Sequence, residues 1–255
     1  MIIRKSPTEL EKMRAAGHLV REILSELSDL AKPGVTTLDL ENIAEQRVVQ
    51  AGARAAFKGY YVQAAGKRFP TVLCTSINEE VVHGVPSAKR VLKDGDILKI
   101  DMGVQLQGYY GDSATTVPIG TISPETQRLL EVTEKSLDLA IEQMVAGRRL
   151  FDVCGTVQNY VEANGFSIVR EFVGHGIGAN LHEAPNVPNF IDRRLSNPRL
   201  RPGMVLAIEP MVAAGAPDTR VLGDRWTAVT TDGSNAAHYE HCVAVTDNGP
   251  WVLTA

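Results

Sequence analysis

The stretch that decides the fold of this chain is Val91-Leu-Lys-Asp-Gly-Asp-Ile-Leu-Lys-Ile-Asp101, a glycine turn followed by an apolar strand that ends in a carboxylate. The pattern returns 108 positions later (209 minus 101) as Arg199-Leu-Arg-Pro-Gly-Met-Val-Leu-Ala-Ile-Glu209. This shift places Gly203 on Gly95 and Glu209 on Asp101. Glycine turns before apolar runs are common, so this match alone leaves both coincidence and duplication open.

A second match, at a shift of 113 positions (147 minus 34), joins two helical stretches. In each copy a glycine precedes the helix, a carboxylate lies in its first turn, where it complements the helix dipole, and a glycine closes it. The paired positions are Gly34 and Gly147, Asp39 and Asp152, Val48 and Val161, and Gly52 and Gly165. Two matches in the same order favour two related halves that meet near residue 120, around an approximate twofold axis. Because no Pro/Ser-rich linker separates them, we expect residues 1–255 to form one compact domain.

Capping and periodicity predict four helices. Ser6-Pro7-Thr8-Glu9 is a capping box with proline at the first helical position, and apolar residues recur after it with a helical period. The other helices are predicted at about 38–51, 123–146 and 150–163. Strand-like runs lie at 97–104, 109–118, 204–212, 226–231 and 236–245, with a hairpin turn at Asp232-Gly233. Helices that cover an antiparallel sheet make the fold class α+β.

The composition is that of an ordinary globular protein. The chain has 255 residues, of which 44% are hydrophobic and 22% charged. A formal net charge of −4 and the lack of a basic stretch argue against direct binding to nucleic acid. No run approaches about eighteen apolar residues, so no membrane span is expected, and the polar start lacks the apolar core of a signal peptide. Cys74, Cys154 and Cys242 are widely spaced, which predicts reduced thiols and a cytoplasmic location.

Five side chains able to bind metal occur in the order Asp101, Asp112, His175, Glu209 and Glu240. One imidazole among four carboxylates is a hard, oxygen-rich set that suits divalent ions such as Mn²⁺, Fe²⁺, Co²⁺ or Zn²⁺. Four carboxylates carry too much negative charge for one ion, and two ions that share carboxylates would balance it. Metal pairs about 3.5–4 Å apart generate hydroxide at neutral pH and stabilise both ends of a hydrolytic displacement. The set therefore predicts a two-metal hydrolase.

Each of these residues also has a structural interpretation. Asp101 and Glu209 end apolar strands, where a surface carboxylate is ordinary, and Asp112 follows a turn. His175 lies between two glycines, which would let the backbone approach a ligand closely. Taken singly, each residue is more often structural, and only the set favours a metal centre.

Two further histidines suit catalysis better than metal binding. His83 lies in a loop context, Asn78-Glu-Glu-Val-Val-His83-Gly84-Val-Pro86, and His182 lies in Leu181-His182-Glu183-Ala-Pro. An imidazole beside an activated water can donate to a developing oxyanion or hold the scissile amide. Alone, each is more often a turn or core histidine. Three other histidines are interpreted as structural: His18, His238 and His241.

Six segments carry a resemblance to a known family. They are Ser76-Ile-Asn-Glu-Glu-Val-Val-His83-Gly-Val-Pro, Asp96-Ile-Leu-Lys-Ile-Asp101, Tyr110-Gly-Asp112-Ser-Ala-Thr, Gly174-His175-Gly-Ile-Gly178, Ile208-Glu209-Pro210 and Tyr239-Glu240-His241. Together they are highly specific. From about Ser6 to Val252 the chain resembles the type I methionine aminopeptidases, metal-dependent enzymes that remove the initiator methionine from nascent proteins. That family has the pita-bread (creatinase/aminopeptidase-like) fold, an internally duplicated α+β structure with pseudo-twofold symmetry.

The resemblance implies a role for each of the five ligands. Asp101 would bind one ion alone, Asp112 and Glu240 would bridge both ions, and His175 and Glu209 would complete the other. Each chain would thus hold two divalent ions. These could be Co, Mn, Fe or Zn, because ligand type does not decide which metal the cell supplies. Metal-activated hydroxide would attack the methionine carbonyl, and Glu209 would carry a proton towards the leaving amine.

The substrate-binding residues also come from the resemblance. His182 would stabilise the oxyanion and His83 would contact the scissile peptide. Tyr60, Cys74 and Trp226 would form the pocket for the methionine side chain. The family's substrates have a small second residue, so the same preference is expected here.

Two features depart from the family pattern, and one spacing narrows the subtype. Leu181 stands where an aromatic residue is frequent, and the segment 61–69 is longer than expected, which leaves the role of Phe69 open. Glu209 and Glu240 are only 31 residues apart (240 minus 209), too few for the helical insertion of type II enzymes. We therefore expect the minimal, bacterial form.

The expected partners are the N-termini of nascent polypeptides at the ribosome, with no direct nucleic-acid contact, no membrane and a monomeric chain. Two alternatives remain open. A proline-specific aminopeptidase or prolidase shares the fold but usually carries an additional N-terminal domain. A non-catalytic binding module of the same fold would have lost metal ligands, whereas this chain has all five.

Overall fold

The four helices begin at or within one residue of their predicted starts. The computed structural model describes residues 2–63 and 65–255. Its helices are α1 (Pro7–Leu30), α2 (Thr37–Gln50), α3 (Pro124–Ile141) and α4 (Leu150–Ala163). The capping box of α1 is formed as predicted: the Glu9 backbone N–H donates to the Ser6 hydroxyl, and the Ser6 backbone N–H donates to the Glu9 carboxylate.

Helix α3 ends at Ile141, not near residue 146 as predicted. Beyond it the chain tightens, because Met144 donates to the carbonyl of Ile141 three residues back. It then turns at Gly147, where φ is +92°, and the Gly147 N–H donates to Leu200 O. The helix therefore ends in a tighter turn before its apolar period does, and the chain after it is tied to a distant loop.

The first sheet places two candidate ligands on one face. It contains β1 (Arg54–Ala55), β4 (Leu73–Ile77), β6 (Ile97–Leu106) and β7 (Tyr109–Pro118), with β6 between β7 on one side and β1 and β4 on the other. In the antiparallel register Cys74 and Ala114 lie opposite Asp101, and Asp112 lies opposite Gly103. Since paired and alternate residues project to the same face, Cys74, Asp101 and Asp112 face one side.

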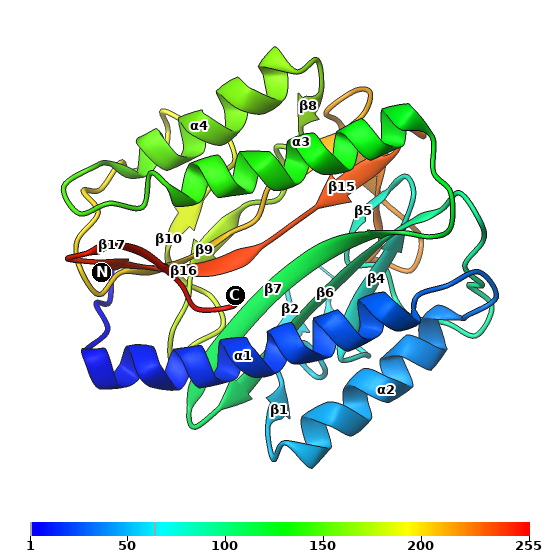
Figure 1. Cartoon of the computed structure of the whole chain (residues 1–255), viewed down its shortest axis with the longest axis horizontal. Helices are drawn as coiled ribbons and strands as arrows, with labels where there is room; N and C mark the ends of the chain where they lie inside the picture. The colour runs from blue at the N-terminus through cyan, green and yellow to red at the C-terminus, as the bar shows by residue number, and fades with distance from the viewer. Residues whose placement is uncertain (1, 64) are drawn as a thin grey trace.

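The opposite face of this sheet packs on the first two helices. Leu98, Ile100, Met102 and Val104 alternate with the site-facing positions and join buried residues of α1 and α2 in one core. The alternation explains how β6 can be apolar along its length and still present a carboxylate. Figure 1 shows α1 crossing β6 and β7, with α2 beside it.

The remaining strands form three small antiparallel sheets and a two-stranded hairpin. One sheet has the order β10-β9-β11-β16-β17: β10 (Glu183–Val187), β9 (Gly174–Gly176), β11 (Val205–Ile208), β16 (His241–Thr246) and β17 (Gly249–Val252). The next has the order β15-β12-β8: β15 (Ala236–His238), β12 (Met211–Ala213) and β8 (Ser167–Ile168). The third is β13 (Thr219–Val221), β14 (Ala228–Thr230) and β5 (Glu80–Val82), and the hairpin is β2 (Tyr61–Val62) with β3 (Lys67–Arg68).

Two predicted strands, 204–212 and 236–245, are each broken at a candidate ligand. The first divides into β11 and β12 at Glu209 and Pro210, and proline has no N–H for a ladder bond. The second divides into β15 and β16, and Glu240 between them makes an isolated antiparallel bridge to Ala114 of the first sheet. In both places the chain passes from one sheet to another, and the glutamate lies at the crossing.

The predicted hairpin at Asp232-Gly233 is wrong. The preceding strand β14 pairs with β13 and β5, whereas the following strand β15 pairs with β12, so the turn links two different sheets. The local turn does form, with φ of +74° at Gly233. A turn signal fixes local geometry, and long-range pairing decides which strands it joins.

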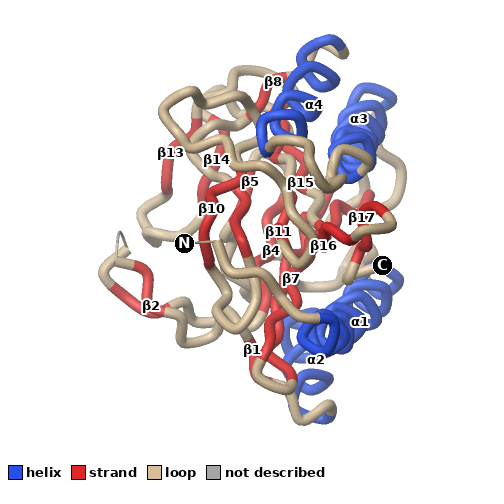
Figure 2. The backbone as a smooth tube through the Cα atoms, turned by 90° about the vertical axis from the view of Figure 1, so that its left-hand side faces the viewer, coloured by secondary structure: helices blue, strands red, loops and turns tan. Residues whose placement is uncertain are grey.

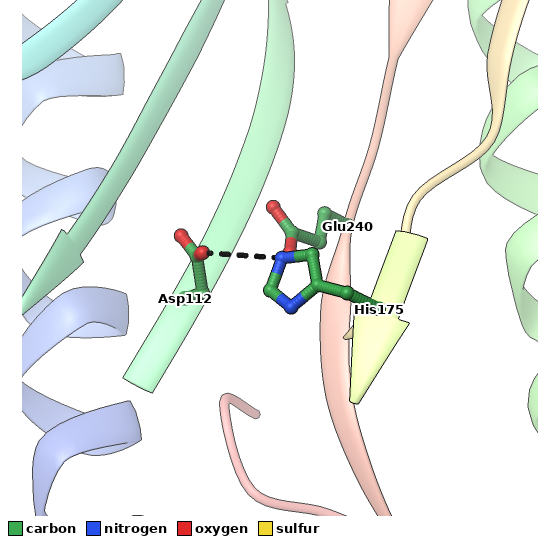
Figure 3. A group of neighbouring side chains, drawn as sticks. All are labelled: Asp112, His175 and Glu240. Carbon is green, nitrogen blue, oxygen red and sulfur yellow. Dashed lines mark ion pairs between the residues drawn. The ribbon is translucent and has the colours of Figure 1, made fainter. Parts of the chain in front are cut away.

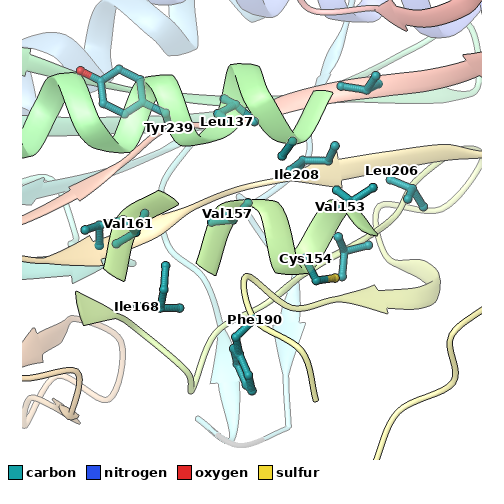
Figure 4. Packing of buried hydrophobic residues seen from close by; sticks show 14 of the residues in the cluster. Leu137, Val153, Cys154, Val157, Val161, Ile168, Phe190, Leu206, Ile208 and Tyr239 are labelled. Carbon is teal, nitrogen blue, oxygen red and sulfur yellow. The ribbon is translucent and has the colours of Figure 1, made fainter. Parts of the chain in front are cut away.

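The second pair of helices, α3 and α4, covers the strands of the other half of the chain. In Figure 2 both pairs lie toward the same side of the strands, with α3 and α4 above and α1 and α2 below (see also Figure 1). Val153, Val157 and Val161 of α4 lie in one buried cluster with Leu206 and Ile208 of β11 (Figure 4). Helices α2 and α4 correspond end to end at the shift of 113 positions, since 37–50 becomes 150–163. This correspondence supports the hypothesis of two related halves.

Two expectations from composition can be compared with the structure. Cys74, Cys154 and Cys242 are buried free thiols, in agreement with the prediction of reduced cysteines. Across residues 2–63 and 65–255, every helix falls short of the length and apolar character that a membrane crossing requires.

Helix α1 approaches strand β7 so closely that only glycine fits at the contact. A Cβ on Gly111 would lie 2.6 Å from the backbone nitrogen of Gly17 and 2.7 Å from the carbonyl carbon of Ala16. We expect Gly111→Ala to cost about 1–3 kcal/mol of stability through overpacking, measured as the free energy of urea unfolding. Gly223→Ala is the matched control, because a Cβ there meets nothing within 4 Å. Equal stability of both variants would contradict this account of the contact.

Candidate metal and substrate site

All ten residues singled out from the sequence line one cavity of about 650 Å³. They come from the first sheet, from the β9–β10 region, from the strand crossings and from the loops next to β2, β5 and β14. The residues are Tyr60, Cys74, His83, Asp101, Asp112, His175, His182, Glu209, Trp226 and Glu240. The fold therefore gathers into one place a set that spans 180 positions of the chain (240 minus 60).

Three of the candidate ligands form a compact group. Asp112, His175 and Glu240 each offer one ligand atom, and these atoms all lie within 4.8 Å of one another (Figure 3). His175 Nε2 is 3.9 Å from Asp112 Oδ2 and 3.8 Å from Glu209 Oε1. Asp101 lines the same cavity, opposite Ala114 in the first sheet.

His175 presents one defined nitrogen to this group. Its Nδ1 lies 2.9 Å from the backbone carbonyl of Gly176, which favours a proton on Nδ1 and leaves Nε2 with a free lone pair. Burial lowers the pKa of His175 to about 4, with His182 adding to the effect, so the ring is neutral at pH 7. A neutral imidazole with one nitrogen held by a carbonyl is the form that binds a metal.

The glycines beside His175 serve a different purpose from the one expected. A Cβ on Gly174 would lie 2.3 Å from Ala207 O, and one on Gly176 would lie 2.4 Å from Ala184 O. The close approach is therefore that of the neighbouring strands β11 and β10, not that of a ligand. Because both positions are glycine, β9 can lie close to β10 and β11. This close packing fixes the position of the His175 side chain.

The carboxylates destabilise one another as anions. Burial raises the pKa of Asp112 to about 7, and burial together with the other carboxylates raises the pKa values of Asp101, Glu209 and Glu240 well above their usual range. Such a cluster is costly unless cations compensate it.

Several buried carboxylate oxygens also have no hydrogen-bond donor. Among the described residues Asp101 Oδ1, Asp112 Oδ1 and Glu240 Oε1 lack a partner. Buried polar atoms are normally paired, and an absent ion is one explanation when they are not. Oxygen atoms and one imidazole, arranged in this way, fit divalent cations.

The two candidate catalytic histidines flank this group. His83, which has φ of +62°, packs edge-on against Phe172 at 5.3 Å between ring centroids. The His182 ring lies 4.3 Å from that of His175, and its Nδ1 lies 2.9 Å from the Tyr60 hydroxyl. Burial lowers the pKa of both, for His83 to about 4, so both are neutral near pH 7. The sequence did not indicate the contact between Tyr60 and His182.

The predicted methionine pocket is apolar and aromatic. Cys74 and Trp226 are buried together with Phe69, whose ring meets that of Trp226 edge-on at 5.1 Å. Burial raises the pKa of the Cys74 thiol, which therefore stays neutral. Phe69, whose role the sequence left open, thus supports the wall formed by Trp226. Within the long segment 61–69, residue 64 lies outside the described residues.

Further lining residues were not identified from the sequence. Phe57, Val82, Phe172 and Met211 face the same cavity. Each belongs to an apolar run whose local pattern does not differ from that of a core residue, so no sequence signal distinguishes them. His238, interpreted from the sequence as structural, has its Nε2 3.7 Å from Glu209 Oε2.

Comparison with protein families gives a match over most of the chain. Residues 11–247 match the model of metallopeptidase family M24. The chain is 50% identical over 254 residues to a methionine aminopeptidase of Clostridium acetobutylicum, covering 100% of this chain and 99% of the relative.

Solved structures agree. A methionine aminopeptidase of Thermotoga maritima superposes with a TM-score of 0.94 at 42% identity, covering 100% of this chain and 99% of the other. A prolidase of Pyrococcus horikoshii superposes with a TM-score of 0.79 at 21% identity, but this chain covers only 64% of it, and the likeness shows the fold alone. The comparisons confirm the α+β pita-bread fold expected from the sequence.

Proposed function

The chain belongs to the methionine aminopeptidases of metallopeptidase family M24, and on this basis we propose that it removes the initiator methionine from proteins whose second residue is small. The observation that carries the proposal is the one cavity in which a neutral imidazole and four carboxylates, two of them buried and two half-buried, adjoin an apolar pocket. A divalent-metal peptidase needs both parts, one to activate water and one to hold the residue removed.

Asp101, Asp112, His175, Glu209 and Glu240 would hold two divalent ions. When bound, such a pair lowers the pKa of water and polarises a carbonyl oxygen. Glu209 accepts the proton of the attacking water and delivers it to the leaving amine. The need for compensating charge at the four carboxylates supports two ions in preference to one.

The histidines act on the substrate. His182 donates a hydrogen bond to the oxyanion, and His83 contacts the scissile peptide. Because the Nδ1 of His182 is bonded to the Tyr60 hydroxyl, its Nε2 is the nitrogen that remains for the substrate. The neutral state of both rings leaves each with one N–H to donate near pH 7.

The pocket selects an unbranched apolar side chain. Cys74, Phe69 and Trp226 offer soft, apolar surface, and a thioether can bend to fill it. The substrates are then the N-termini of nascent polypeptides met in the cytoplasm, and a single chain carries the whole site. The proposed active unit is the monomer.

We expect Met-Ala-Ser to be cleaved far faster than Met-Lys-Ser, Leu-Ala-Ser or Ala-Pro-Ala at equal concentration. The norleucine analogue of Met-Ala-Ser should be a poorer but real substrate, since apolar pockets discriminate small differences by only about 1–3 kcal/mol. Release of the first residue from each peptide, followed by chromatography, provides the measurement. Preferential cleavage of Ala-Pro-Ala would contradict the proposal and favour a proline-specific peptidase.

A further inference from the structure

His238 is a buried histidine with unexplained polar atoms. His238 is 1% exposed, and neither of its ring nitrogens, Nδ1 or Nε2, has a hydrogen-bond partner among the described residues. Leaving a buried polar group unpaired destabilises the folded state. A side chain that only filled the core would be better apolar at this position.

The backbone of His238 is held firmly beside Glu209. His238 of β15 pairs with Met211 of β12, and Met211 follows Glu209 by two residues. Thr116 Oγ1 accepts from the His238 N–H and donates to its carbonyl oxygen. The ring is thereby aimed at the strand crossing from which Glu209 projects, and its Nε2 lies 3.7 Å from Glu209 Oε2.

The two oxygens of Glu209 face different partners. Oε1 lies 3.8 Å from His175 Nε2, on the side of the ligand group, whereas Oε2 faces His238. The His238 ring carries at least one N–H in either of its ordinary protonation states, so it can donate to a carboxylate oxygen. The separation exceeds the usual 2.7–3.2 Å of an N–H···O bond by a margin that a rotation of the Glu209 side chain can close.

We propose that His238 is a positioning residue for Glu209: its Nε2–H donates to Oε2 and so turns Oε1 towards the metal ligands. The inference rests on the proposed function, because it needs Glu209 to bind an ion. Partners of this kind orient the ligands they contact, and their loss commonly costs about 10–100-fold in metal affinity or activity.

Three substitutions separate a hydrogen bond from packing. The Gln side chain in His238→Gln places an amide N–H near the position of the imidazole Nε2. The shorter Asn side chain in His238→Asn places its amide only near the position of Nδ1. The Leu side chain in His238→Leu has no hydrogen-bond donor. We expect Leu and Asn to weaken Mn²⁺ binding to the metal-free protein by about 10–100-fold, measured by isothermal titration calorimetry. The Gln variant should stay close to wild type in Mn²⁺ affinity and in kcat. His18→Gln, on helix α1 outside the cavity, is the control and should leave both unchanged.

The outcomes are distinct. Wild-type Mn²⁺ affinity in His238→Leu, or equal losses in the Leu and Gln variants, would overturn the positioning role. If the Leu variant does not fold, the comparison of Gln with Asn decides, since both are polar and differ only in reach. A wild-type protein that binds no Mn²⁺ would refute the proposed function, and the inference about Glu209 with it, before any variant is compared.

Discussion

Asp112→Asn should lower the rate of methionine release by roughly 10³-fold or more. The metal contribution to such hydrolysis amounts to several kcal/mol, and each 1.36 kcal/mol is a factor of ten. Asp112 belongs to the compact ligand group with His175 and Glu240, and its Oδ1 is one of the buried oxygens without a donor. Replacing a carboxylate oxygen with an amide removes both the charge and a ligand position.

Asp152→Asn is the matched control for this substitution. Asp152 accepts from the Arg149 backbone N–H at the start of α4, so it is a structural carboxylate of the same type, and we expect its loss to leave the rate nearly unchanged. A chelator should abolish activity, and Co²⁺, Mn²⁺ or Fe²⁺ should restore it. Undiminished turnover after metal loss has been verified by elemental analysis would refute the metal mechanism.

Metal binding to this group should also release protons near neutral pH. Because burial raises the pKa of Asp112 to about 7, and those of its neighbours rise as well, the metal-free cluster holds protons that an incoming ion must displace. The affinity for Mn²⁺ should therefore increase as pH rises towards 7. Calorimetry in buffers of different ionisation enthalpy counts the protons released and accompanies the Asp112 experiment.

The helices were predictable because their signals are local. Ser6 with Glu9, Ser123 and the carboxylate Asp152 all act within one turn of chain, and the helices begin where these residues indicate. The strands at 204–212 and 236–245 were predicted as continuous because apolar character does not reveal a change of sheet. Their breaks, at Glu209 and Glu240, depend on pairings with distant strands.

The candidate site was predictable mainly through the family resemblance. Local context favoured a structural role for each ligand taken singly, and only the joint set pointed to a metal centre. The proximity of His238 to Glu209 could not be predicted, because the two residues are distant in sequence and the strand of His238 is apolar. The glycines beside His175 were expected to let the backbone approach a ligand, whereas the close packing of neighbouring strands explains them. What the sequence could not supply was in every case a contact between remote segments.

His182→Ala should lower kcat by about 10²–10³-fold, the usual loss for one oxyanion donor, roughly 2.7–4 kcal/mol. The reason is geometric: the Tyr60 hydroxyl bonds to Nδ1 of His182 at 2.9 Å and directs the other ring nitrogen to the substrate. Metal content should stay intact, because His182 is not a ligand in this proposal. Steady-state kinetics on Met-Ala-Ser, with elemental analysis of each preparation, provides the measurement.

Tyr60→Phe tests the same contact from its other side. It removes one hydrogen bond, which contributes about 0.5–1.5 kcal/mol, so kcat should fall by no more than roughly tenfold. The donor His182 remains present, but its orientation is less well defined, and the loss must therefore be smaller than that of His182→Ala. If His182→Ala raised KM and left kcat unchanged, His182 would bind the ground state and transition state equally, and its role at the oxyanion would be wrong.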